Sequence, residues 1–231
     1  MRYKAVFLDL DNTLYDFSAN SREAYSEVYD LLGYSRYFSS FDEYFDIYSK
    51  RNDELWRLYD AGSISKDELN GSRYLHPLQV AGVKGAEEIS RRFFAEAMKI
   101  LPHKGRLRPH AIECLEYLRP RYKLYILSNG FTELQRSKMR SAGIEHYFTD
   151  VVLSEDIGVN KPRRELFDYA LTVSGTTAKE SLMIGDNMET DIEGAKHAGW
   201  DQMFYNFKQL SPLPFQPTFE IHSLGEVKDW I

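Results

Sequence analysis

The sequence contains very little cysteine: Cys114 is the single one among 231 residues. One cysteine cannot form a disulfide within the chain, which argues against a disulfide-stapled scaffold and favours a reducing, cytoplasmic location. Cys114 lies in a helical pattern, HAIECLEYLR, and no side chain in that segment would activate its thiol. We therefore expect a small buried core residue there and not a nucleophile.

Long apolar runs and an excess of positive charge are also missing. The segment MRYKAVFLDL has no apolar stretch of the length that a signal peptide or a membrane span needs, so we expect no membrane partner. A formal net charge of -6 and a pI of about 5.6 provide no field that would attract a nucleic acid polymer. The six histidines are scattered without zinc-ligand spacing, which argues against a zinc site.

Short apolar runs alternate with helical patterns through most of the chain. The runs that predict strands are KAVFLDL, KLYILSN, VVLSE, SLMIGD, QMFYN and TFEIHSL, and one of the helical patterns between them is ETDIEGAKHAG. Strands separated by helices indicate parallel βαβ units. The sequence therefore predicts an α/β fold with a doubly wound parallel sheet.

The segment after the first predicted strand differs from the rest, because it shows helical patterns and no convincing strand. Its third helix is expected to begin at Ser65, which is followed three residues later by Glu68 in a capping-box pattern. We predict two domains: an α/β core of residues 1–15 plus 104–231, and a helical insertion of residues 16–103.

An aspartate pair, Asp9 and Asp11, ends the first predicted strand. Ligands of doubly wound sheets bind at the carboxyl ends of the strands, and residues two apart in an extended segment project to the same side. Two close carboxylates suit phosphoryl chemistry if one is a nucleophile and the other a general acid and base. A solvated acidic turn is the alternative, but Asp9 belongs to a run that is otherwise expected to be buried.

Three further polar groups follow later predicted strands. Ser128 and Asn129 can bind phosphate oxygens, Lys161 can neutralise an anion, and Asp186 with Asp191 can supply the oxygen ligands that Mg²⁺ prefers. Taken singly, each group also fits an ordinary loop, a solvated lysine or a capped helix start. Their order along the chain and their placement, taken together with the aspartate pair, are a much stronger signal than any one of them.

In that order, DLDNTL, LSNG, the lysine of NKP, and GDNMETD closely resemble the four motifs of the haloacid dehalogenase (HAD) superfamily. The resemblance covers essentially the whole chain, and the helical insertion resembles the family's C1 cap. It implies a Rossmann-like core and a Mg²⁺-dependent phosphomonoester hydrolase that forms an aspartyl phosphate. Asp11 favours phosphoryl chemistry over dehalogenation, because a halide leaves without a proton.

The resemblance also implies roles for single residues. Asp9 would be the nucleophile, and Asp11 the general acid and then the base. Mg²⁺ would be bound by Asp9, the main-chain carbonyl of Asp11 and Asp186, with Asp191 assisting directly or through water. Three residues would bind the phosphoryl group: Ser128, Asn129 and Lys161.

The insertion contains YSKRNDELWRLYDAGSISKDELNGSRYLHPL, which is similar to caps of the house-cleaning pyrimidine 5'-nucleotidases of bacteria. This similarity implies a nucleoside 5'-monophosphate substrate, with Asn52, Trp56 and Arg73 as candidate contacts. Two alternatives stay open. The aromatic residues at helical spacing can simply pack the insertion's own core, and Arg73 can be a surface or ion-pair residue (the aromatic set is Tyr44, Tyr48, Trp56 and Tyr59).

Other functions use the same residues. A sugar-phosphate phosphatase or a phosphomutase has the same aspartate pair, and a phosphoacceptor signalling module has a similar sheet. The insertion argues against the signalling module, which needs an open face for its kinase. The expected partner is a small phosphate ester, and both a monomer and a homodimer fit the sequence.

Overall fold

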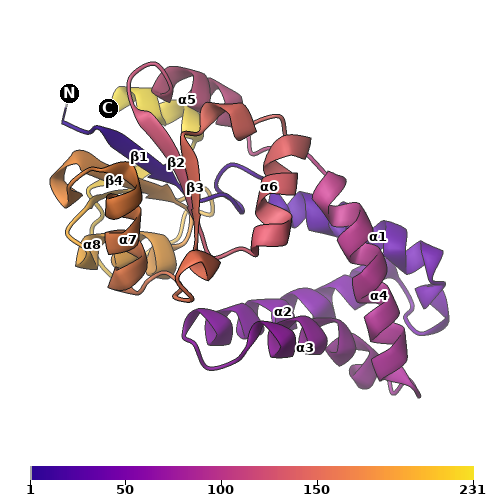
Figure 1. Ribbon diagram of the computed structural model, residues 1–231. Coiled ribbons are helices and arrows are strands. Elements are labelled where there is room, and N and C mark those ends of the chain that lie inside the picture. Colours follow the sequence, from indigo (N-terminus) through magenta and orange to yellow (C-terminus); the bar gives the residue numbers. More distant parts are fainter. Residues whose placement is uncertain (1) are drawn as a thin grey trace. The chain divides into compact units, whose positions relative to one another are not determined.

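The computed structural model describes residues 2–231 (Figure 1). The chain forms two compact units, one comprising Met1–Phe17 and Gly105–Ile231, and the other comprising Ser18–Lys104. The first is called the core unit below, and the second the helical unit.

The core unit is built on one six-stranded sheet in which every neighbouring pair is parallel, as the alternation of strands and helices predicts. The order is β3-β2-β1-β4-β5-β6. The bounds are β1 Ala5–Leu8, β2 Lys123–Ser128, β3 Asp150–Leu153, β4 Ser181–Gly185, β5 Asp201–Tyr205 and β6 Phe219–Ile221. Each predicted strand is present; five are shorter than their apolar runs, and β5 has the same length as its run but begins one residue earlier.

Both faces of the sheet are buried, which is why its strands read as continuous apolar runs. In β1, Val6 and Leu8 pack in a cluster that includes Cys114 of α5 (Ala111–Leu118). Ala5 and Phe7 pack on the opposite face, in a cluster that includes residues of α7 (Arg164–Ser174). Cys114 is buried, as predicted. The helices of this unit are α5 Ala111–Leu118, α6 Thr132–Ser141, α7 Arg164–Ser174 and α8 Gly194–His197 (Figure 1).

One predicted helix is α-helical only in its last residues. The pattern ETDIEGAKHAG begins as a π-helical turn, Met188–Glu193, and only Gly194–His197 is α-helical. Asn187 caps the turn, because its side-chain oxygen accepts hydrogen bonds from two backbone N–H groups, of Glu189 and Thr190. A π-turn accommodates an extra residue per turn, and such turns are frequent at functional sites.

The helical unit contains four α-helices, and its core is largely aromatic. Rings of Tyr25, Tyr44, Tyr74 and Phe93 lie among the fully buried side chains. Ser65 begins the third helix with the predicted capping box to Glu68. The helices are α1 Phe17–Leu31, α2 Phe41–Asp60, α3 Lys66–Val80 and α4 Ala86–Ile100.

Short 3₁₀ helices lie at Tyr34–Arg36, Leu101–His103, Glu145–Tyr147, Ser154–Asp156, Ala178–Glu180 and Leu224–Asp229. Across residues 2–231, none of the helices combines the length and the apolar character that crossing a membrane requires.

Candidate active site

The candidate site lies where the chain reverses its direction of travel across the sheet. The chain proceeds from β1 to β2 and β3 on one side, and then returns to β4 on the other side of β1. Asp9 follows β1, Ser128 is the last residue of β2, and Gly185 is the last residue of β4. Parallel pairing therefore brings three of the sequence motifs to adjacent strand ends, at the point where doubly wound sheets bind ligands.

A buried lysine connects two of the motif carboxylates. The Nζ atom of Lys161 lies 2.7 Å from Asp9 Oδ1 and 2.6 Å from Asp191 Oδ1, and it donates to the carbonyl oxygen of Leu127 at 2.7 Å. The side chains of Lys161 and Asp191 are 2% and 1% exposed. All three donor positions of the ammonium are thus used by the protein, so the lysine is held in one place.

Burial and neighbouring charges together shift the pKa values of Lys161 and Asp9. Burial alone would lower the pKa of Lys161, but the carboxylates of Asp191 and Asp9 outweigh it, and the pKa lies above its ordinary value. Burial raises the pKa of Asp9 well above its usual range, although the Lys161 ammonium opposes that effect. The carboxylates of Asp191 and Asp186 raise the pKa of Asp9 further, so this acidic group lacks sufficient positive charge.

Asp186 is the third member of the acidic group. Its Oδ1 accepts a hydrogen bond from Thr13 Oγ1 at 3.0 Å, and its backbone N–H donates to the same hydroxyl at 3.0 Å. Burial, followed by repulsion from Asp191, raises the pKa of Asp186 to about 7. One carboxylate oxygen from each of Asp9, Asp186 and Asp191 lies within 4.8 Å of the others.

These carboxylates fit a hard divalent cation such as Mg²⁺. They offer oxygen ligands only, and the raised pKa values of Asp9 and Asp186 mark a place where added positive charge is stabilising. Gly185 leaves the room that the arrangement needs, because a Cβ atom there would lie 2.2 Å from Asp191 Oδ2. The donor set therefore suits the cofactor that the sequence motifs imply.

The side-chain amide of Asn129, which the sequence predicts to bind the phosphoryl group, makes hydrogen bonds within the protein. Its Nδ2 donates to the carbonyl oxygen of Lys161 at 2.9 Å, and its Oδ1 accepts from the Lys161 backbone N–H at 2.8 Å. This pair of bonds fixes the backbone of the lysine that connects Asp9 and Asp191. The predicted phosphoryl contact of Asn129 stays a prediction.

Two residues at the site were missed by the sequence analysis, and both come from α6. Lys138 Nζ lies 2.8 Å and 2.9 Å from the two carboxylate oxygens of Asp11, and Gln135 Nε2 donates to Asp11 Oδ2 at 3.0 Å. Gln135 Nε2 also donates to Ser128 Oγ at 2.7 Å. The one sequence signal was their spacing of three residues, which places both on one face of a helix that directly follows LSNG.

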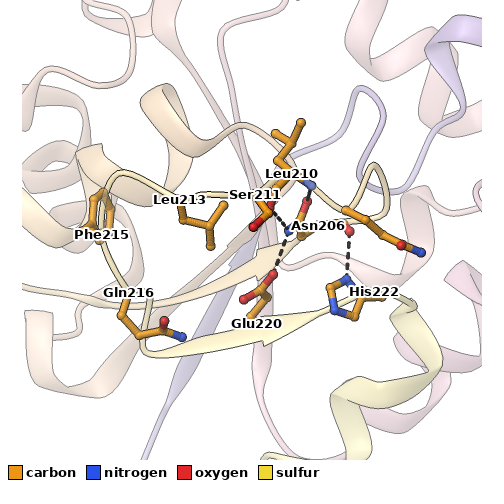
Figure 2. A pocket seen from close by; sticks show the side chains of 9 residues that line it. Asn206, Leu210, Ser211, Leu213, Phe215, Gln216, Glu220 and His222 are labelled. Atoms are coloured by element: carbon orange, nitrogen blue, oxygen red, sulfur yellow. Dashed lines mark hydrogen bonds between the residues drawn. The ribbon is translucent and has the colours of Figure 1, made fainter.

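A separate pocket of about 490 Å³ lies in the loop between β5 and β6 (Figure 2). Asn206 closes this loop, because its amide donates to the Leu210 carbonyl at 3.1 Å and to Glu220 Oε1 at 2.7 Å. His222 Nδ1 lies 3.0 Å from the carbonyl oxygen of Asn206. The nine residues that line the pocket include none of the motif residues, so we assign the chemistry to the acidic group.

Comparison with known proteins agrees with the motifs. The family model for haloacid dehalogenase-like hydrolases matches residues 3–199. The chain belongs to this family. Pyrimidine 5'-nucleotidase YjjG of Escherichia coli is 31% identical over 99% of this chain and 97% of its own length. Pyrimidine 5'-nucleotidase PynA of Streptococcus pneumoniae is 30% identical over 99% and 95%.

A solved structure shows the same fold. The HAD-hydrolase YfnB of Bacillus subtilis, bound to magnesium and described as revealing interdomain movement, superposes with a TM-score of 0.88 at 26% identity. The match covers 99% of this chain and 98% of that one. The predicted family and the predicted Rossmann-like α/β core are both confirmed, and the protein is a hydrolase of the HAD family.

The three candidate residues of the helical unit lie on α2 and α3. Arg73 is buried, so its interpretation as a surface residue is wrong. Its guanidinium donates to Asn70 Oδ1 at 2.5 Å and to Asn52 Oδ1 at 3.5 Å, and its Nε has no hydrogen-bond partner among the described residues. Trp56 is partly buried and contacts the Tyr59 ring edge-on, with centroids 5.6 Å apart.

The alternative of simple core packing holds for part of the aromatic stripe. Tyr44 and Tyr48 are buried in the helical unit. Tyr48 also donates to Asn52 Oδ1 at 3.2 Å, so Asn52 accepts bonds from both a tyrosine and Arg73. The helical unit therefore contains a buried polar group beside its aromatic core.

Proposed function

We propose that this HAD-family hydrolase is a Mg²⁺-dependent phosphatase that hydrolyses phosphate monoesters through an aspartyl phosphate on Asp9. The observation that carries the proposal is the buried Lys161, which binds Asp9 and Asp191. These two carboxylates belong to an acidic group in which burial and mutual repulsion raise the pKa of Asp9, so a further positive charge is stabilising. Such a site can bind a cation and then a dianionic phosphate. The nucleotidase names of two full-length relatives support a phosphate ester as substrate.

In the proposed reaction, an oxygen of Asp9 forms a bond to phosphorus while the bond from phosphorus to the leaving oxygen breaks. Asp11 donates a proton to that leaving oxygen. Asp11 then accepts a proton from a water molecule, whose oxygen attacks phosphorus and releases inorganic phosphate and the free Asp9 carboxylate. Lys161 fixes the orientation of Asp9 through its Oδ1 atom.

The phosphoryl oxygens need positive charge and hydrogen-bond donors. Mg²⁺ would be held by Asp9, Asp186 and the main-chain carbonyl of Asp11, with Asp191 in its second shell, and would neutralise charge on the phosphoryl oxygens. Ser128 and Asn129 of the core unit would bind the phosphoryl group, and Lys161 would neutralise its charge from its place beside Asp9.

For the substrate, we propose a nucleoside 5'-monophosphate with a pyrimidine base, turned over in the cytoplasm. Residues 16–103 would be the C1 cap, and Asn52, Trp56 and Arg73 would select the substrate. The support is the full-length similarity to two pyrimidine 5'-nucleotidases and the buried polar group around Asn52 and Arg73.

The test is phosphate release from a panel of nucleoside monophosphates and sugar phosphates, with Mg²⁺ and with EDTA. We expect release that requires Mg²⁺, is greatest for pyrimidine nucleotides, and is abolished by Asp9→Asn. Asp168→Asn, at an exposed carboxylate of α7, is the matched control and should keep full activity. Release that persists in Asp9→Asn would refute the proposed nucleophile.

The same panel separates the alternatives. Turnover of sugar phosphates without nucleotides would favour a sugar-phosphate phosphatase, and transfer of phosphate between sugar positions would favour a phosphomutase. Stable phosphorylation of Asp9 without turnover would favour a signalling module. Selective loss of nucleotide turnover in Trp56→Leu, with 4-nitrophenyl phosphate still hydrolysed, is expected if the helical unit selects the base.

A further inference from the structure

Lys138 is a buried lysine that the proposed reaction does not yet use. Its side chain is 4% exposed, although the helix that carries it, TELQRSKMRS, is polar. A buried ammonium needs a partner, and here the partner is the Asp11 carboxylate, which it contacts through both oxygens at 2.8 Å and 2.9 Å. The rings of Phe17 and Tyr15 lie 4.9 Å and 5.5 Å from its Nζ and confine the cation further.

Gln135, one helical turn earlier on α6, joins the same carboxylate to the phosphate-binding motif. Its Nε2 has two hydrogens, and it donates to Asp11 Oδ2 at 3.0 Å and to Ser128 Oγ at 2.7 Å. Gly130 also donates its backbone N–H to Ser128 Oγ, at 3.1 Å. The serine oxygen thus accepts two hydrogen bonds, so its own proton is available to donate to an anion.

Gly130 is needed for this arrangement because of space. A Cβ atom at this position would lie 2.0 Å from Gln135 Nε2, a distance that no real contact allows. The glycine of the LSNG motif therefore admits the Gln135 amide between Asp11 and Ser128.

We propose that Lys138 is a positioning residue for the reaction: together with Gln135 it holds the Asp11 carboxylate where the leaving oxygen departs. Gln135 at the same time fixes the position of this carboxylate relative to Ser128, which would donate a hydrogen bond to the phosphoryl group. This inference rests on the proposed phosphatase function. The Asp11 side chain keeps 27% of its surface exposed, so a substrate can reach it while α6 holds it. Lys138 itself acts through Asp11 and not on the substrate.

The test depends on the acidity of the leaving group. A leaving oxygen from an acidic phenol departs without a proton, whereas one from a weakly acidic phenol needs the general acid. We would measure kcat/KM for a series of para-substituted phenyl phosphates, from 4-nitro to 4-methoxy, with the unchanged protein and with Lys138→Met. The series keeps the shape of the substrate nearly constant and changes mainly the leaving-group pKa.

In Lys138→Met we expect kcat/KM to fall by roughly tenfold or more for 4-methoxyphenyl phosphate and by less than about threefold for 4-nitrophenyl phosphate. The ratio of the two values does not depend on how much of a preparation is folded. Lys179→Met, at an exposed lysine before the amino end of β4, is the matched control and should leave both values unchanged. Lys138→Arg, which restores a cation, should recover part of the ratio.

An equal loss for both esters would overturn the positioning role, because a purely structural lysine affects all substrates alike. Gln135→Leu provides a second, uncharged test: it should change the ratio in the same direction, and an unchanged ratio would also overturn the proposal. Failure of the unchanged protein to hydrolyse any of the phenyl phosphates would instead refute the proposed phosphatase, and this role with it.

Discussion

Asp186 gives the sharpest prediction about stability, because its pKa is raised to about 7 in the folded protein. The cause is burial together with the Asp191 carboxylate, and an unfolded chain has neither. Replacing Asp186 by Asn removes the charge and keeps the oxygen that accepts the Thr13 hydrogen bond at 3.0 Å. The substitution therefore isolates the electrostatic cost of the carboxylate.

The magnitude follows from the difference between the folded pKa of about 7 and the ordinary value of 3.8. Each pKa unit corresponds to about 1.4 kcal/mol, so the ionised Asp186 costs the metal-free protein up to roughly 4 kcal/mol of unfolding free energy. For a chain of this size, 1 kcal/mol shifts Tm by roughly 2–4 °C. We expect Asp186→Asn to unfold several degrees above the unchanged protein at pH 8 in EDTA.

The direction in which stability changes with pH follows from proton linkage. The folded state binds the Asp186 proton more tightly than the unfolded state, so this stability contribution is fully present below about pH 4. It is lost as pH rises through about 7. The unchanged protein in EDTA should therefore lose stability across this window, and Asp186→Asn should lose less.

The assay is thermal unfolding at several pH values between 5 and 8.5, in EDTA and in Mg²⁺, with Asp168→Asn as the control for loss of an exposed carboxylate. Mg²⁺ should raise the Tm of the unchanged protein at pH 8 and should raise that of Asp186→Asn much less, because the variant lacks the negative charge that attracts the ion. If Asp186→Asn in EDTA unfolds at or below the temperature of the unchanged protein at pH 8, the electrostatic reasoning is refuted.

Three further changes have specific expected outcomes. Thr13→Val removes the hydrogen bond to Asp186 and should weaken Mg²⁺ affinity by roughly tenfold in a calorimetric titration, with little change in the fold. Ser65→Ala removes a helix cap and should lower the unfolding free energy by about 1 kcal/mol in urea, while kcat stays unchanged. Burial raises the pKa of the Cys114 thiol to about 12, so maleimide should label this residue only in denaturant; rapid labelling of the folded protein would contradict its burial.

Much of the core unit could be predicted from the sequence, because a sheet buried on both faces leaves a direct record of apolar runs. Val6 and Phe7 are both fully buried although they face opposite sides, and only a doubly covered strand allows this. The polar residues that directly follow such runs then indicate the site. Asp9 was placed in this way, whereas Lys161, more than 150 positions later and just before α7, was placed in the same site by the order of the motifs.

The contribution of α6 could not be predicted. Lys138 lies in a polar segment, and a lysine in such a segment is usually solvated. Its burial depends on the contact with Asp11 and the nearby rings, which are formed only by the folded core unit. The alternative that placed Arg73 on the surface fails for the same reason, because its partner Asn52 lies on α2 and meets Arg73 of α3 only after folding.

The closeness of Gly130 to the Gln135 amide has an evolutionary consequence. A methyl group at position 130 would force the Gln135 amide out of its place, since the Cβ would lie 2.0 Å from Nε2. Relatives that lose the glycine should therefore carry a shorter side chain at the position of Gln135, and the two positions should covary. The stability lost in Gly130→Ala should be recovered more by Gln135→Ser than by any change at Lys138. The glycine of the LSNG motif is thus constrained by a helix that the motif does not include.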